Sequence, residues 1–205
     1  MAYIRAADRE EQIVAAAVQV LSTVGVAGTT LRAVATQAGI PLGTLHYVFP
    51  SKDQMLRAVI ARLIEDVVDE IATVLGSAVD VEQGLAFAIR HGLTTLWTEL
   101  VSGHTNLQIM QYELVTYALR TPGQESLARW QYERYASVVA EWCQRAAQNS
   151  GETCAVPFGR LARVALASVD GLILQYVCDA NESRSREDLD TTIDMIIAMA
   201  GIRSP

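Results

Sequence analysis

Residues 30–52, TLRAVATQAGIPLGTLHYVFPSK, decide the fold of this chain. Thr30 can cap a helix by accepting a hydrogen bond from a free backbone N–H, and Gly39 suits the left-handed turn that ends one. Pro41 fits the first turn of the next helix, where a missing N–H costs nothing. Apolar residues recur at helical spacing on both sides of this turn, so the stretch predicts two short helices and the start of a third.

The second of these helices turns its polar side toward solvent. Its leucine, valine and phenylalanine side chains point back onto the first helix, as in a helix-turn-helix. A helix that has small side chains at its N-terminal end and carries hydroxyl, imidazole and phenol groups suits the major groove of DNA. On these residues alone, an ordinary helical hairpin in an all-α core is the alternative. The outward residues are Pro41, Leu42, Gly43, Thr44, His46 and Tyr47.

The run TTLRAVATQAGIPLGTLHYVFPSKDQML at 29–56 resembles the DNA-binding signature of the TetR (tetracycline repressor) family of bacterial transcription regulators. The AVATQAG core, the GTL triplet, Tyr47, Phe49 and Lys52 all stand in the register of that family. The resemblance implies a DNA-binding helix-turn-helix domain followed by a helical domain that binds an inducer and forms a dimer.

The same resemblance implies roles for individual residues. Pro41 replaces a residue that is often polar in the family, and His46 replaces one that is often tyrosine, so we expect an unusual DNA sequence preference. Phosphate contacts are expected from Thr30, Thr44, Tyr47 and Lys52, and positions near the bases from Arg32, Leu42, Gly43 and His46. Pro41 is also a predicted DNA-binding residue.

The composition fits a globular all-α protein of two domains. The chain has 205 residues, of which 51% are hydrophobic and 19% charged, enough for more than one core. We predict a helix-turn-helix DNA-binding domain at 1–52 and a helical ligand-binding and dimerisation domain at 53–205. The helical pattern predicts helices at 9–24, 51–75, 81–101, 106–120, 124–149, 157–178 and 185–202.

The formal net charge of −7 is unusual for a DNA-binding protein. Residues 1–52 carry four basic and three acidic side chains, so the acidic excess lies in the rest of the chain. Affinity for DNA depends on the field close to the groove, which distant charges disturb little. Few phosphate contacts per subunit predict a modest salt dependence and reliance on a dimer.

The sequence predicts a cytoplasmic protein that contacts no membrane. No uninterrupted apolar run approaches the ~20 residues that cross a bilayer, and the N-terminus is charged where a signal peptide would be apolar. Cys143, Cys154 and Cys178 have no metal-type spacing and indicate free thiols in a reducing compartment. Redox sensing by one of them is the alternative to a packing role.

An enzyme is the less favoured interpretation. His91 and His104 have no partner at metal-ligand spacing, and the chain contains no HExxH, GxSxG or glycine-rich phosphate loop. We therefore predict no catalytic residue, no metal and no cofactor.

The middle of the chain is rich in aromatic and polar residues. Aromatic walls with a few polar groups suit a small-molecule pocket, and Glu113, one turn from Tyr117, suits a cationic or hydroxylated ligand. That these residues only fill a helical core is the open alternative. The predicted ligand-binding set is Trp97, Gln108, Met110, Tyr112, Glu113, Tyr117, Trp130 and Tyr135.

The last two predicted helices have the small and apolar stripes of a helix–helix interface. Together they offer more apolar surface than one compact domain needs, which suggests a twofold dimer. The run SVDGLILQYV also resembles the dimer-forming end of TetR-family proteins, and an internal core pair is the alternative. The predicted interface residues are Ala165, Ser168, Gly171, Leu172, Ile193, Ile196 and Ile197.

We therefore expect a homodimeric, ligand-responsive transcriptional regulator, in the first instance a repressor. Its expected partners are a double-stranded DNA operator with an inverted repeat, a small-molecule inducer and a second copy of itself. The alternative is a helical small-molecule-binding protein or enzyme with vestigial DNA binding. Its ligand and its operator are not specified by the sequence.

Overall fold

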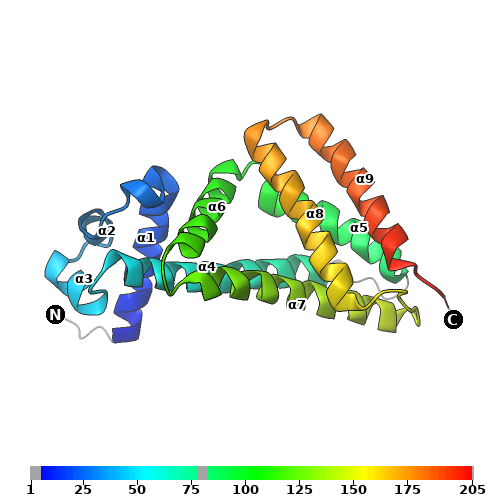
Figure 1. Ribbon diagram of the computed structural model, residues 1–205, viewed down its shortest axis with the longest axis horizontal. Coiled ribbons are helices and arrows are strands. Elements are labelled where there is room, and N and C mark those ends of the chain that lie inside the picture. The colour runs from blue at the N-terminus through cyan, green and yellow to red at the C-terminus, as the bar shows by residue number, and fades with distance from the viewer. Residues whose placement is uncertain (1–5, 78–82, 205) are drawn as a thin grey trace. The chain divides into compact units, whose positions relative to one another are not determined.

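The computed structural model describes residues 6–77 and 83–204, and most of them are helical. Thr153 and Arg203 form an isolated antiparallel β-bridge. The described residues contain no β-strand beyond this bridge. The all-α prediction is thus confirmed. The helices are α1 (Ala6–Gly28), α2 (Leu31–Gln37), α3 (Leu42–Val48), α4 (Lys52–Ser77), α5 (Gly84–Leu96), the π-helical η1 (Trp97–Val101), α6 (Thr105–Arg120), α7 (Glu125–Asn149), α8 (Phe158–Cys178) and α9 (Glu182–Ala200) (Figure 1).

α2 and α3 form the predicted helix-turn-helix. Thr30 Oγ1 accepts a hydrogen bond of 3.1 Å from the backbone N of Ala33 and caps α2. Gly39 has a φ of +65°, which lets the backbone N of Ile40 donate to the carbonyl of Ala35 at 3.0 Å. Both predictions are confirmed, because each depends on backbone geometry within a few residues.

α1 packs against α2 and α3 and extends beyond its predicted end. Gly25 interrupts the helical geometry with φ 68° and ψ 179°, and one further turn follows to Gly28. Ile13 and Leu21 are buried. Val24 is not buried but 50% exposed, because the chain changes direction at the next residue.

The described helices form two compact units. The first contains the chain up to Asp66 together with Ile109–Trp130, and the second contains Val67–Gln108 and Gln131–Pro205. The first unit therefore combines the helix-turn-helix with most of α6 and the beginning of α7. The domain boundary predicted after residue 52 stays a prediction.

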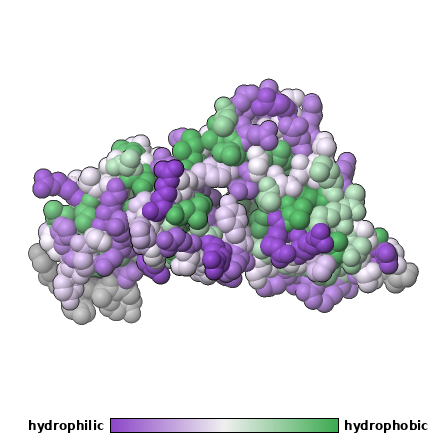
Figure 2. Space-filling view, in the orientation of Figure 1, coloured by the Kyte–Doolittle hydropathy of each residue, from purple (hydrophilic) through white to green (hydrophobic). Residues whose placement is uncertain are grey.

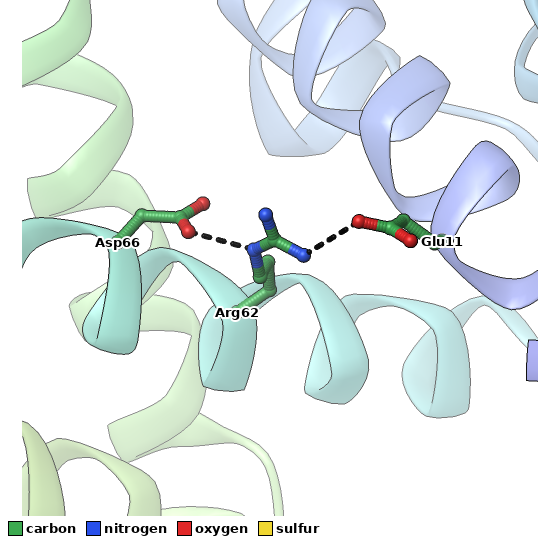
Figure 3. Close-up of polar contacts among 3 residues, drawn as sticks. All are labelled: Glu11, Arg62 and Asp66. Carbon is green, nitrogen blue, oxygen red and sulfur yellow. Dashed lines mark hydrogen bonds and ion pairs between the residues drawn. The ribbon is translucent and has the colours of Figure 1, made fainter. Parts of the chain in front are cut away.

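Within the first unit, Arg62 joins α1 to α4. Its Nη1 lies 3.1 Å from Oε1 of Glu11, and its Nε lies 2.7 Å from Oδ1 of Asp66 one turn along α4 (Figure 3). The hydrogen bonds to Asp66 and then to Glu11 raise the pKa of the Arg62 guanidinium. All three side chains are exposed, so water and salt weaken this bridge.

The second unit has its own core. The indole Nε1 of Trp142 donates to the carbonyl of Leu75 at 2.7 Å. A Cβ on Gly92 would lie 2.8 Å from a methyl of Leu75 and 2.9 Å from the Trp142 ring, so only glycine fits there. α9 packs on both α5 and α8, and Ile193 is buried at this contact.

Two described helices match the length and mean hydropathy of a membrane span. They are Asp8–Gly28 of α1 and Phe158–Cys178, which is α8. The prediction concerned uninterrupted apolar runs, and both of these helices contain charged residues, so the absence of a membrane contact stays a prediction. Helices in the core of a folded domain also reach this length and mean hydropathy. α1 packs on α2 and α3 in this way.

Candidate nucleic-acid interface and ligand-binding region

The outward face of α3 is open. Tyr47 is 89% exposed, and Pro41, Gly43 and His46 are also exposed, while Thr44 is half-buried. A Cβ on Gly43 would meet no described atom within 4 Å. A phenol, an imidazole and a hydroxyl therefore project from a helix whose N-terminal part is narrow enough to approach base edges. We call these five residues, together with Leu42, the α3 face.

Two further predicted DNA contacts lie outside α3. Arg32 is exposed on α2. Thr30 is exposed as well, but its Oγ1 is the acceptor that caps α2. The hydroxyl hydrogen of Thr30 can still be donated to a phosphate, so capping and DNA contact are compatible.

Lys52 is bonded within the protein. Its Nζ donates to the carbonyl of Val26 at 2.7 Å, and the residue is half-buried. An ammonium group has three donors, so two N–H groups remain for a phosphate. The phosphate role of Lys52 stays a prediction, and the structure adds a bond that joins the start of α4 to the end of α1.

The Val26 peptide is held from both sides. Its carbonyl accepts from Lys52, and its N–H donates to Oε2 of Glu113 on α6 at 2.8 Å. A Cβ on Gly25 would lie 2.8 Å from the same carboxylate oxygen. Position 25 therefore needs glycine both for its φ and for this close approach. We call Gly25, Val26, Lys52 and Glu113 the Val26 clamp.

Tyr117, one turn along α6 from Glu113, makes a second link within this unit. Its hydroxyl donates to Oδ1 of Asp53 on α4 at 2.5 Å. Burial and this hydrogen bond raise the pKa of Tyr117. Gln124 donates from Nε2 to the carbonyl of Asp53 at 3.4 Å, while its buried Oε1 has no partner among the described residues.

Glu113 and Tyr117 use polar groups for bonds within the protein, and their role as ligand contacts stays a prediction. Their polar groups bond to α1 and α4, because helical spacing places both on the side of α6 that meets these helices. Met110 lies in the same unit and is buried, whereas Tyr112 and Trp130 are half-buried.

Trp97 and Gln108 belong to the core of the second unit. The Trp97 ring meets the Tyr176 ring edge-on at 5.6 Å, and Gln108 Nε2 donates to the carbonyl of Leu100 at 2.8 Å. The Tyr176 hydroxyl donates to Glu182 at 2.5 Å. This hydrogen bond is the main cause of the lowered pKa of Glu182. Trp97 and Gln108 therefore contact groups of the same unit, which favours a packing role for both residues.

Tyr135 lies in a different polar cluster of the second unit. Tyr132, three residues earlier on α7, donates its hydroxyl to Oδ2 of Asp170 on α8 at 2.9 Å. Burial and the Asp170 charge raise the pKa of Tyr132 to about 12. Burial, then Tyr132, then the charges of Asp170 and Glu70 raise the pKa of Tyr135. We call Tyr132, Tyr135 and Asp170 the tyrosine–carboxylate cluster.

Sequence reasoning found Tyr135 in this cluster but missed Tyr132 and Asp170. Two signals were available. Tyr132 and Tyr135 share one face of a helix, and Asp170 is the single acidic residue in the helix at 158–178. Ligand contact by the whole predicted set, Tyr135 included, stays a prediction.

The predicted interface residues have different environments. Ala165, Ile193 and Ile196 are buried within their own chain, so they have little surface left to give to a partner. Ser168, Leu172 and Ile197 are half-buried, and Gly171 is exposed. Apolar patches lie over α8 (Figure 2). The structure adds three exposed apolar side chains on these two helices, which are Val164, Leu174 and Met195.

Two family models match the chain. The family model described as bacterial regulatory proteins, tetR family, matches residues 13–59. The model described as tetracyclin repressor-like, C-terminal domain, matches residues 88–199. The first match contains the α3 face, and the second contains Tyr132, Tyr135 and Asp170.

Individual relatives cover nearly the whole chain. The HTH-type nicotine-responsive transcriptional repressor HdnoR of Paenarthrobacter nicotinovorans is 30% identical over 200 residues, which are 97% of this chain and 99% of that protein. A TetR-family structure from Mesorhizobium loti has a TM-score of 0.79 at 18% identity and covers 96% of this chain and 98% of its own. The multidrug binding protein EbrR in complex with ethidium has a TM-score of 0.64 at 25% identity, covering 90% and 98%.

Proposed function

Because this chain belongs to the TetR family of bacterial regulatory proteins, which are ligand-responsive DNA-binding regulators, we propose that it is a homodimeric cytoplasmic repressor released from its operator by a small molecule. The observation that carries the proposal is the open α3 face on a capped helix-turn-helix. The nicotine-responsive repressor at 30% identity supports both repression and control by a ligand.

On DNA, each subunit inserts α3 into a major groove. Two subunits related by a twofold axis read an inverted repeat, with the two recognition helices about 34 Å apart. Tyr47, Thr44, Thr30 and the remaining donors of Lys52 hold phosphates, while His46 and the narrow end of α3 approach the bases. The exposed apolar residues of α8 and α9 supply the proposed dimer contact.

The ligand signal reaches the helix-turn-helix through α6. Glu113 and Tyr117 bond α6 to the end of α1, which packs on α2 and α3, and to the start of α4, which follows α3 in the chain. A shift of α6 would therefore alter the position of the α3 face. The ligand must bind the released state more tightly than the DNA-bound state, because equal affinity for both shifts nothing.

The first test is selection of bound duplexes from a random DNA pool by the purified protein at about 0.1 M salt. Enrichment of an inverted repeat is expected, and analytical ultracentrifugation should show a dimer. A folded, ligand-stripped dimer that enriches no sequence would contradict the proposal.

A second measurement tests the response to ligand. Operator affinity is measured while a bound small molecule is titrated, and a large fall at saturation is expected. Unchanged operator affinity at full occupancy would remove the induction part of the proposal while leaving DNA recognition intact.

A further inference from the structure

We propose that Gln12 on α1 is a positioning residue for DNA recognition, which fixes the N-terminal end of α3 without touching the DNA. The inference rests on the proposed function, since it concerns how α3 approaches the operator. Gln12 Nε2 donates a hydrogen bond of 2.8 Å to the carbonyl of Ala38, the C-cap residue of α2. Ala38 begins the connection to α3, and we call residues 38–41 the α2–α3 turn.

The Ala38 carbonyl needs a donor from outside its own helix. The last carbonyl groups of an α-helix have no partner within that helix. The backbone N–H groups of Gly39 and Ile40 donate back to carbonyls of α2, so they hold the turn to α2 but to no other helix. Gln12 supplies the missing donor from α1, 26 residues earlier in the chain.

The first turn of α3 has little other support. Of the seven residues of α3, Leu45 is the buried one, and Phe49 just after the helix is buried as well. The residues of the α2–α3 turn are half-buried or exposed. Pro41 is the N-cap residue of α3, and its side chain has no polar atom that could cap the helix. Buried packing therefore holds the middle and the end of α3, and the position of its first turn depends largely on the α2–α3 turn.

Arg9 orients the Gln12 amide. Its Nη1 donates to Oε1 of Gln12 at 2.9 Å, from one turn earlier on α1. A carboxamide whose oxygen accepts from Arg9 has its NH₂ group free to donate to the Ala38 carbonyl. Arg9 is half-buried and Gln12 is exposed. Water can replace these hydrogen bonds when a side chain is removed, so their loss should leave the fold intact.

Gln19 provides a matched comparison on the same helix. It lies about two turns further along α1 and is also exposed. Its Oε1 accepts a hydrogen bond from Nε2 of Gln37 on α2. This bond joins α1 to α2 through two side chains and holds no backbone group of the α2–α3 turn. Gln19 therefore links the same two helices without fixing the start of α3.

Three roles for Gln12 predict different changes in DNA affinity when the residue is replaced. Loss of a phosphate contact lowers affinity for every duplex by the same factor. Loss of a purely structural contact lowers stability and leaves both affinities unchanged well below the thermal midpoint. Loss of a positioning residue reduces the population of the α3 orientation that fits the base edges, so it weakens operator binding selectively.

The experiment measures the affinity of the full-length protein for its selected operator and for random DNA by fluorescence anisotropy. Gln12→Met removes the donor but keeps the length and the neutral charge of the side chain. An exposed hydrogen bond favours the held orientation by about threefold per subunit, so the preference for operator should fall about tenfold in a dimer. Affinity for random DNA should change by less than about twofold. An unchanged preference, or equal losses on both duplexes, would overturn the proposal.

Hydrogen exchange of the free protein tests the anchor without DNA. In Gln12→Met, the backbone amides of residues 39–45 should exchange faster than in the wild type, because the turn is no longer held to α1. The peptides of α4 should exchange as before, which also shows that the variant is folded. Unchanged protection at 39–45 would overturn the proposal.

Gln19→Met is the matched control. The same substitution on the same helix should leave the preference for operator unchanged, because the Ala38 carbonyl keeps its donor. A loss equal to that of Gln12→Met would show that any loosening between α1 and α2 is sufficient, and it would overturn the specific role of Gln12.

A double-variant cycle tests the orienting role of Arg9. Arg9→Met should lower the preference for operator in the wild-type background but not in Gln12→Met, since Arg9 acts through the Gln12 amide. Independent, additive losses in the double variant would overturn this part of the proposal.

Selection of operator DNA by the wild-type protein separates this proposal from the proposed function. A wild-type protein that enriches an inverted repeat, together with a Gln12→Met variant that keeps the full preference, refutes the positioning role alone. A folded, ligand-stripped wild-type dimer that enriches no sequence refutes the regulatory function and the positioning role with it.

Discussion

The α3 face and the Val26 clamp are two polar regions of the same unit with opposite construction. On the α3 face the polar side chains project into solvent, and Tyr47 is 89% exposed. In the clamp, Lys52 and Glu113 are both bonded to the backbone of Val26. The glycines differ in the same way, since a Cβ would meet nothing described near Gly43 but a carboxylate at 2.8 Å near Gly25.

This difference shows how one unit divides its polar residues. The side chains that we propose to contact DNA are open to solvent, as expected for groups whose hydrogen-bond partners are on the DNA. Groups that set the angle between helices are bonded internally, because an unpaired group there would cost stability. Substitutions in the two regions should therefore separate folding from DNA binding.

The largest expected effect is loss of stability in Gly25→Ala. A φ of 68° with ψ of 179° is almost restricted to glycine, and the new methyl group would displace Glu113. We expect a loss of about 3 kcal/mol in the free energy of unfolding, measured by urea denaturation. Gly39→Ala is the control, because φ is also positive there but the space is open. Equal losses in the two variants would argue against the Glu113 contact.

The next effect is on DNA affinity, in Tyr47→Phe. Loss of one phosphate hydrogen bond per subunit, at about 1 kcal/mol each, lowers operator affinity of a dimer about 30-fold. The same factor should apply to unrelated duplexes, since a phosphate contact carries no sequence information. Fluorescence anisotropy on operator and random DNA measures both. A loss confined to the operator would instead assign Tyr47 to base reading.

Glu113→Ala should have a moderate effect in the clamp. The variant loses a charged hydrogen bond to Val26 at an exposed position, so we expect a destabilisation of about 1 kcal/mol. Base preference in a DNA selection should remain unchanged, because the α3 face is intact, while the change in operator affinity on ligand binding should shrink. Full ligand response in a variant without Glu113 would exclude the clamp from signal transfer.

Gly43→Ala should maintain or raise thermal stability and lower operator affinity. Alanine is favoured over glycine in a helix by up to about 1 kcal/mol, and no described atom obstructs the methyl group. Thermal unfolding should therefore occur at the same or a higher temperature, while operator affinity falls where α3 lies close to the bases. Undiminished affinity would place position 43 away from the DNA.

The smallest effect is expected from Arg62→Ala. Both of its ion pairs are exposed and screened by water (Figure 3). The thermal midpoint should change little at physiological salt, and any change should vanish at high salt. A large, salt-insensitive loss would mean that Arg62 contributes through packing of its side chain.

Prediction of the site from the sequence succeeded where a residue acts locally. The cap at Thr30, the turn at Gly39 and the outward positions of His46 and Tyr47 follow from helix geometry over a few residues. Helix geometry did not identify the polar partners of Glu113 and Tyr117 within the protein. Glu113 bonds to a residue 87 positions away, and no period in the sequence specifies such a pairing.

The apolar stripe of α9 shows the same limit of prediction from sequence. Ile193 and Ile196 carry the spacing of an interface stripe, yet α9 directs them into the core formed with α5 and α8. Helical periodicity identifies a buried face but does not distinguish a neighbour in the same chain from one in a second copy.

The sequence by itself determined the helices, the helix-turn-helix and the membership of a regulator family, because caps, turns and periodicity depend on neighbouring residues. Only the tertiary structure decided which helix each polar group meets. It placed Lys52 and Glu113 on opposite sides of the Val26 peptide, and it brought Tyr132 to Asp170 across 38 residues of chain. Contacts of this kind depend on how whole helices pack, and packing is a property of the complete core.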